Sequence, residues 1–205
     1  TVTITDSTPT AILFSAGNGD GIFAIATSGA VTIADATNLD YETTSSYTLT
    51  IVAYDASSSD VADITISITD VNDAPTVATA ISDASTAEDT AYSLDISSNF
   101  ADADSGDALS FSATGLPSSG NLAITSAGVI SGTPLNADVG AHTIVVTATD
   151  DDSTPASVAD TYILTVTNTN DAPTVASAIS DVSAAEDAAY SLDVSGTCTD
   201  VDVGD

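Results

Sequence analysis

The chain has 205 residues, 30 of them acidic, and contains neither lysine nor arginine, so its formal net charge at pH 7 is −30. A chain without basic side chains cannot neutralise phosphate groups, which excludes nucleic acid and anionic membrane surfaces as partners. Hydrophobic residues make up 43% of the sequence, enough for the cores of about two domains. No apolar run approaches the roughly 18 residues of a membrane span, so membrane insertion within this segment is excluded as well.

Short runs in which apolar and polar residues alternate follow one another along the chain, separated by Gly, Pro, Asn and Asp. A period of two is typical of half-buried antiparallel strands, and no segment carries a helical period. About seven short strands in each hundred residues predict an all-β fold of tandem Greek-key β-sandwiches strung end to end. The clearest runs are residues 47–54, 64–69, 92–96, 109–113, 142–148 and 162–166.

The hexapeptide Asp70-Val71-Asn72-Asp73-Ala74-Pro75 returns 98 residues later as Asn168-Thr169-Asn170-Asp171-Ala172-Pro173. Roughly three-quarters of the positions in residues 69–97 are identical to those in 167–195. A period near 100 is a whole domain, so each proline marks a boundary between similar domains. We therefore expect a first repeat (1–75) that lacks its first strand, a complete second repeat (76–173) and the opening strands of a third repeat (174–205).

Only three of the acidic residues are Glu: Glu42, Glu88 and Glu186. Asp is common in turns because its short side chain bonds nearby backbone, so most of the Asp residues need no functional explanation. Glu is depleted in strands, and a long carboxylate that can bind bidentately is a reason to keep it there. Because Asp, Glu, Asn and backbone oxygens are the ligands of hard cations, the acidic motifs predict bound calcium.

Ordered motifs of the first repeat resemble the signature of a cadherin repeat. They are Phe23-Ala24-Ile25, Gly29-Ala30-Val31, Leu39-Asp40-Tyr41-Glu42, Val52-Ala53-Tyr54-Asp55 and the hexapeptide at Asp70. The second repeat is similar to the dystroglycan-type cadherin-like domain of large bacterial surface proteins. Its markers are Ala87-Glu88-Asp89, Phe100-Ala101-Asp102-Ala103-Asp104, Gly115-Leu116-Pro117, Gly132-Thr133-Pro134 and Ala148-Thr149-Asp150.

The resemblance implies calcium ions between consecutive repeats, held by residues of both. The resemblance implies these ligands at the first junction: Asp40, Glu42, Asp70, Asn72, Asp73, Asp102, Asp104 and Asp150. Asp55 is a further candidate ligand. At the second junction they are Glu88, Asn170, Asp171, Asp200 and Asp202, and Glu186 repeats the place of Glu88 in the third repeat. Asn168 replaces Asp70, and residues 130–134 lack the Leu-Asp-x-Glu motif, so we expect fewer or weaker ions at the second junction.

These features favour a calcium-rigidified extracellular stalk or filament of a microbial surface protein, located at the cell surface or secreted. Its partners would be neighbouring repeats or identical subunits. Alternatives are a module that binds carbohydrate or protein, and an accessory domain of a secreted hydrolase. Nothing in the sequence pairs a nucleophile with a base, so we expect no enzyme.

The first and third repeats are each partial, and two explanations fit. The chain is a window in a continuous giant protein, which the sequence alone favours. Alternatively, separate chains polymerise head to tail, with residues 174–205 of one donating strands to residues 1–75 of the next. In that case Glu186 of the neighbour would complete the site of Asp40 and Glu42.

Two further predictions concern packing. Cys198 aligns with Phe100 at the 98-residue offset, which predicts a buried, apolar environment. Five tyrosines fit core or inter-sheet packing: Tyr41, Tyr54, Tyr92, Tyr162 and Tyr190.

Overall fold

The computed structural model describes residues 9–119 and 121–202, and in them the fold is all-β, as expected. The helical elements of this part are three turns of 3-10 helix, η1 (Ser97–Asn99), η2 (Asn136–Asp138) and η3 (Ser195–Thr197). None of the helices in the described residues is long and apolar enough to cross a membrane. The chain forms two compact units, one of residues up to Asp73 with 103–106, the other of 74–102 with 107 onward.

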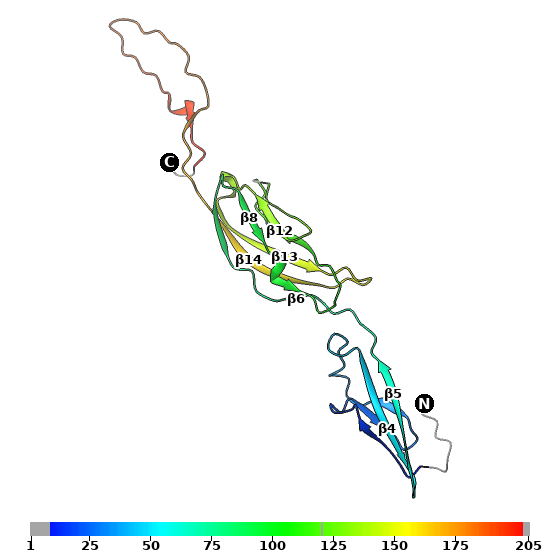
Figure 1. Cartoon of the computed structure of the whole chain (residues 1–205). Helices are drawn as coiled ribbons and strands as arrows, with labels where there is room; N and C mark the ends of the chain where they lie inside the picture. The colour runs from blue at the N-terminus through cyan, green and yellow to red at the C-terminus, as the bar shows by residue number, and fades with distance from the viewer. Residues whose placement is uncertain (1–8, 120, 203–205) are drawn as a thin grey trace. The chain divides into compact units, whose positions relative to one another are not determined.

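The second repeat is a β-sandwich of two sheets (Figure 1). One sheet has the order β10 (Ser110–Thr114), β13 (Gly140–Thr149), β14 (Ser157–Thr167) and β7 (Ala84–Ala87). The other has the order β11 (Ala123–Ile124), β12 (Val129–Gly132) and β8 (Tyr92–Asp95). Neighbouring strands are antiparallel except β7, which runs parallel to β14. A short pair, β6 (Thr76–Val77) and β9 (Phe100–Ala101), lies at the start of the repeat.

The core of the second repeat lies between its two sheets. Ile144 and Val146 of β13, and Leu164 of β14, are fully buried together with Ile130 of β12 from the other sheet. Phe100 packs against Phe111 with ring centroids 5.6 Å apart. The alternating residues of the strands therefore bury one face of each sheet, which is how a chain with few aromatics still forms a closed core.

The first repeat has a smaller version of the same arrangement. One sheet has the order β1 (Ala11–Ala16), β4 (Ser46–Tyr54) and β5 (Ser59–Ser67). The other consists of β2 (Phe23–Ile25) and β3 (Val31–Ile33). Ile22, Phe23 and Leu49 form its core, and the rings of Phe23 and Tyr47 meet edge to face at 5.2 Å between centroids. The six strand runs predicted from alternation all coincide with observed strands, although β5 begins at Ser59, five residues before the predicted run.

The 98-residue repeat of the sequence is also a repeat of backbone structure. The pair β15 (Thr174–Val175) and β16 (Cys198–Thr199) reproduces β6 and β9, and η3 reproduces η1. The amide of Ala78 donates to Asn99 O and the amide of Ala176 donates to Thr197 O, at 2.9 and 2.8 Å. Between β15 and η3, however, residues 176–194 form no strands, whereas their counterparts in the second repeat form β7 and β8.

Four of the packing predictions are wrong. Cys198 is exposed. Tyr41, Tyr54 and Tyr190 are 38%, 41% and 51% exposed, so they are not core residues. Tyr162 is buried and Tyr92 is partly buried beside the same core, as predicted. Burial thus follows the completeness of the surrounding sheets, which is greatest in the second repeat.

Two glycines allow a strand to cross closely over its neighbour. Gly17 and Gly115 are equivalent at the 98-residue offset and have φ of +83° and +80°. A Cβ at Gly115 would lie 2.1 Å from Thr143 O, and one at Gly17 would lie 2.0 Å from Thr48 O. Only glycine satisfies both the left-handed backbone and the close approach.

Gly115→Ala is expected to destabilise the second repeat by about 1–3 kcal/mol, because it adds a clash with backbone to a strained φ. Calorimetric unfolding would measure the loss. Gly19→Ala is the matched control, since an added Cβ there meets nothing within 4 Å. Equal unfolding temperatures for the two variants would contradict this account of Gly115.

Candidate metal centres

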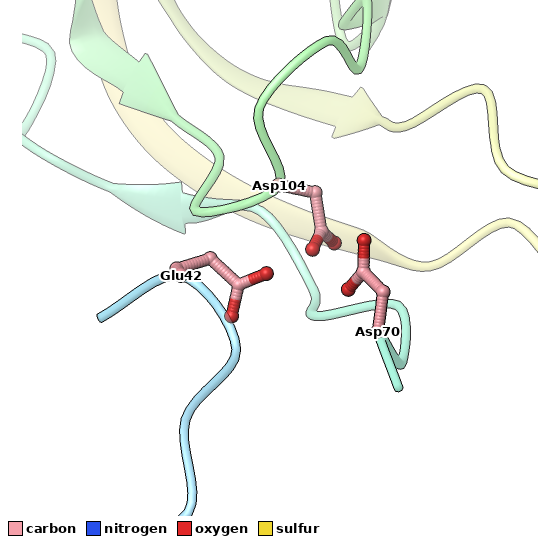
Figure 2. A group of neighbouring side chains, drawn as sticks. All are labelled: Glu42, Asp70 and Asp104. Carbon is pink, nitrogen blue, oxygen red and sulfur yellow. The ribbon is translucent and has the colours of Figure 1, made fainter. Parts of the chain in front are cut away.

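The first acidic cluster is formed by Glu42, Asp70 and Asp104, which offer carboxylate oxygens within 4.8 Å of one another. Glu42 comes from the loop between β3 and β4, Asp70 from the segment after β5, and Asp104 from the loop after β9. Figure 2 shows the three carboxylates directed toward a common space. All three residues belong to the first compact unit, which includes residues 103–106.

Local hydrogen bonds position this cluster. Asp40 accepts the amides of Glu42 and Thr43 at 3.0 and 3.2 Å, which fixes the turn that presents Glu42. The amide of Asp73 donates to Asp104 Oδ2 at 2.7 Å. A hydrogen bond from its own backbone lowers the pKa of Glu42, but desolvation, a hydrogen bond with Asp40 and the charges of Asp70 and Asp104 raise that pKa overall. The carboxylates therefore repel one another, which a cation would relieve.

The second cluster is formed by Glu88, Asp89 and Asp171, again with oxygens within 4.8 Å of one another. Glu88 follows β7, is only 1% exposed, and donates its amide to Thr167 O at 3.0 Å. Its Oε1 accepts the amide of Thr169 at 2.8 Å. Its Oε2 is buried and has no hydrogen-bond partner in the described part of the chain.

Asp89 and Asp171 are each held by a hydrogen bond that their own backbone amide donates. Asp89 has φ of +56° and donates its amide to Pro134 O at 2.8 Å. The amide of Asp171 donates to Asp202 Oδ2 at 2.7 Å, the same contact that joins Asp73 to Asp104 one repeat earlier. Desolvation raises the pKa of Asp171, and the charges of four neighbouring carboxylates, Asp89, Asp202, Glu88 and Asp200, raise it further.

An open pocket of about 500 Å³ adjoins the second cluster. Its lining is formed by Asn170, Asp171, Pro173, Cys198, Thr199 and Asp200. Asp202 donates its amide to Asp200 Oδ1 at 3.0 Å and accepts from Asn136 Nδ2 at 3.2 Å, which holds this loop in place.

A third group, Asp102, Asp104 and Asp107, lies within the single loop between β9 and β10. It shares Asp104 with the first cluster, so the same carboxylate is near both groups. Asp102 and Asp107 are half-buried.

The residues present fit calcium rather than a soft metal. The three clusters consist of carboxylates alone, with no His or Cys, and hard cations prefer such oxygen ligands. A buried carboxyl group with one unpartnered oxygen is costly unless a positive charge or a hydrogen bond is supplied. Glu88 meets that description, so the second cluster has the strongest requirement for a cation.

The structure groups some of the predicted ligands and not others. Six of the predicted ligands belong to a cluster: Glu42, Asp70, Asp104, Asp102, Glu88 and Asp171. The others lie outside the three clusters: Asp40, Asp55, Asn72, Asp73, Asp150, Asn170, Glu186, Asp200 and Asp202. Among these, Asp55 accepts the amides of Ser57 and Ser58 in a tight turn, and Asp150 accepts the amide of Ala156.

Asp89 and Asp107 are cluster members that the list of predicted ligands omits. Both had a signal in the sequence. Asp89 directly follows Glu88 in a motif that recurs at Ala185-Glu186-Asp187, and Asp107 recurs as Asp205 at the 98-residue offset.

Comparisons with known proteins agree with the fold. Residues 74–167 match the model of a family described as a putative Ig domain. No curated protein matches the chain. Among solved structures, repeats EC22–24 of mouse cadherin-23 are similar, with 22% identity over 77% of this chain and a TM-score of 0.60. This chain covers 53% of that fragment, about half its length.

Two further cadherin structures are similar. Human mucin-like protocadherin EC1–2 is 16% identical to this chain and has a TM-score of 0.56. The match spans 82% of this chain and 92% of the protocadherin chain. Drosophila N-cadherin EC1–4 is 28% identical to this chain and has a TM-score of 0.54. The match spans 77% of this chain and 40% of the N-cadherin chain. The chain therefore has the fold of cadherin-like and Ig-like β-sandwich repeats.

Glu88→Gln tests the second cluster. Without calcium, the variant is expected to be more stable than the wild type, because it removes a buried charge and keeps the shape. With calcium at about a hundredfold excess over its Kd, the wild type should gain about 2.7 kcal/mol that the variant does not. Calorimetric unfolding with and without calcium measures both effects. Asp20→Asn is the control, since Asp20 is exposed and lies outside the three clusters; an equal calcium gain in wild type and Glu88→Gln would contradict the assignment.

The raised pKa of Asp171 predicts the direction in which stability changes with pH. A carboxylate whose pKa is raised on folding binds its proton more tightly in the folded state, so stability increases as pH falls toward that pKa. Asp171 should therefore add stability to the calcium-free chain as pH falls from neutral through its raised pKa, and Asp171→Asn should remove that contribution. Asp152→Asn should leave the gain intact, because hydrogen bonds from Thr154 and Ser153 lower the pKa of Asp152, so that it takes up its proton only at lower pH.

Proposed function

We propose that the chain is a calcium-rigidified structural or adhesive repeat of an extracellular microbial surface protein, forming part of a stalk or filament. The observation that carries the proposal is Glu88, a buried carboxylate with an unpartnered oxygen beside Asp89 and Asp171. With no Lys or Arg in the sequence, a cation from solution is the available source of compensating charge.

Bound calcium would neutralise these carboxylates and tie together segments that are distant in sequence. In the second cluster those segments are the end of β7, through Glu88 and Asp89, and the linker residue Asp171. In the first cluster they are the loop of Glu42, the linker residue Asp70 and the loop of Asp104. Linkers held by ions lose freedom of motion, so each filled cluster stiffens the chain locally.

The proposed setting is extracellular because of the affinity such sites have. Calcium sites of extracellular modules typically have Kd values of about 0.1–1 mM. They fill at the calcium concentrations outside cells and stay empty inside. The cadherin-like fold and the string of similar repeats are those expected of surface proteins that act at a distance from the cell. The microbial assignment rests on the resemblance of the second repeat to domains of bacterial surface proteins.

The expected difference between the clusters is part of the proposal. The first is made of exposed Glu42 and Asp70 with half-buried Asp104, whereas the second contains the buried Glu88. Asn168 replaces one linker carboxylate near the second cluster. Two classes of calcium site with different affinities would follow, and with them joints of different stiffness.

Calcium titration tests the proposed function. Isothermal titration of the chelator-treated chain should resolve two classes of site, with Glu42→Gln removing one and Glu88→Gln the other. Hydrogen exchange at the linker amides of Asp73 and Asp171 should slow when calcium is added, and magnesium at the same concentration should have a smaller effect, because Mg²⁺ keeps its water ligands. Protection that is identical with calcium and with chelator would refute the proposal.

A further inference from the structure

The segment of residues 134–138 lies between β12 and β13, contains the turn η2, and is anchored in the body of the second repeat. Pro134 is fully buried, and Asp138 is only 2% exposed. The carboxylate of Asp138 accepts the amide of Ser119 through Oδ1 and the amide of Leu135 through Oδ2, both at 3.0 Å. Both oxygens of this buried acid therefore fix the segment, which we call the scaffold segment.

The scaffold segment contacts two acids that belong to, or lie beside, the second cluster. Pro134 O accepts the amide of Asp89 at 2.8 Å, and Asp89 has the left-handed φ of +56°. The side-chain Nδ2 of Asn136 donates to Asp202 Oδ1 at 3.2 Å, across 66 residues of sequence. One short segment thus bonds to Asp89, which precedes it in the chain, and to Asp202, which follows it.

Asp202 transmits the contact of Asn136 to Asp171. It is 7% exposed, and its Oδ2 accepts the amide of Asp171 at 2.7 Å while its Oδ1 is bonded to Asn136. This geometry is not peculiar to one place in the chain, because the amide of Asp73 donates to Asp104 Oδ2 at the same 2.7 Å one repeat earlier. Displacing Asp202 would therefore displace the backbone of Asp171, which belongs to the second cluster.

Asn136 is suited to this contact because its side-chain amide carries N–H donors without a charge. Hydroxyl donors of this chain bond carboxylates within their own turn, as Thr43 does with Asp40 at 2.8 Å. Asn136 instead reaches the carboxylate of a loop that is distant in sequence. A buried carboxylate is costly without a hydrogen-bond partner, so Asn136 lowers the cost of burying Asp202.

The internal repeat shows the same stretch of chain used in a second way. At the 98-residue offset, residues 36–40 correspond to the scaffold segment, and Asn38 corresponds to Asn136. Two residues beyond the scaffold segment, Gly140 stands where the first repeat has Glu42, a member of the first cluster. The stretch after β3 thus leads to a cluster carboxylate, whereas the stretch after β12 holds acids that other loops provide.

We infer that Asn136 is a positioning residue of the second cluster, which holds Asp171 in place through Asp202. All the bonds on this path join protein atoms, so they hold the two acids whether or not an ion is bound. The scaffold segment then prepares the second cluster for a cation without supplying a ligand to it. The effect on calcium affinity rests on the proposed function, whereas the effect on the backbone of Asp171 does not.

Hydrogen exchange of the full chain in chelator tests the positioning role without calcium. Asn136→Leu keeps the size of the side chain and removes its donors, so exchange at the amide of Asp171 should become about tenfold faster. Unchanged exchange within β13 and β14 would show that the repeat is folded. Asn38→Leu is the matched control and should leave exchange at Asp171 as in the wild type. Equal rates at Asp171 in wild type and Asn136→Leu would overturn the proposal.

Asn136→Asp separates the donor from the shape of the side chain. It places a second carboxylate opposite Asp202, so exchange at Asp171 should be faster than in Asn136→Leu. Because salt screens the repulsion between charges, this excess should shrink when NaCl is raised with chelator present. If only the volume of the side chain mattered, both variants would exchange like the wild type at every salt concentration, and the proposal would be wrong.

Calcium titration tests the consequence for the second cluster. Asn136→Leu should weaken the class of site that Glu88→Gln removes by about tenfold, because losing a residue that orients a ligand lowers metal affinity. The class that depends on Glu42 should be unchanged. Equal affinities in wild type and Asn136→Leu would overturn the effect on calcium. Absence of calcium binding in both chains, with faster exchange at Asp171 in the variant, would refute the proposed calcium function and support the positioning role alone.

Discussion

The absence of basic side chains is the constraint on which the rest of the structure depends. The sequence has thirty acidic residues, no Lys or Arg, and one histidine, His142, whose Nε2 contacts the backbone oxygen of Asp138. Backbone amides take the place of lysine and arginine. Asp138 accepts the amides of Ser119 and Leu135, Asp160 that of Ile81, and Asp83 that of Ile163. Each such bond satisfies a carboxylate oxygen and fixes a loop at the same time.

This use of the backbone separates the structural aspartates from those in the clusters. A hydrogen bond from Ser97 lowers the pKa of Asp95, and one from Ser195 lowers the pKa of its repeat counterpart Asp193. Turns thus satisfy many aspartates locally. Repulsion is left where loops and linkers converge, around Glu42 and Asp171, whose pKa values are raised. The proposed calcium sites lie at these two places.

Much of the fold could be predicted from the sequence because its strands follow a strict alternation. The runs at residues 142–148 and 162–166 lie within β13 and β14, which form the longest ladder of the second repeat. Exposure could not be predicted in the same way. Tyr190 has the same neighbours in sequence as Tyr92, but its burial depends on strands that pair with it, and alternation says nothing of those strands.

The candidate site was predictable only in part, for a related reason. Motif order indicated Glu88 and Asp171, because a glutamate at a strand end is unusual. It placed Asp89 beside Glu88 in a recurring motif, but it could not indicate the left-handed backbone of Asp89 at φ of +56°. Nor did it separate Asp55 from Asp70: both are in matching motifs, but Asp55 is held by the amides of its own turn. Residue type identifies a possible ligand, while the local backbone decides whether its oxygens are available.

The parallel pairing of β7 with β14 has a mechanical consequence. β7 lies near the beginning of the second repeat and β14 at its end, so tension along the chain pulls the two strands in opposite directions along their length. The four residue pairs from Ala84–Leu164 to Ala87–Thr167 are then loaded together in shear, rather than opened one at a time like a zipper. Extension of this repeat therefore requires the hydrogen bonds between β7 and β14 to break together.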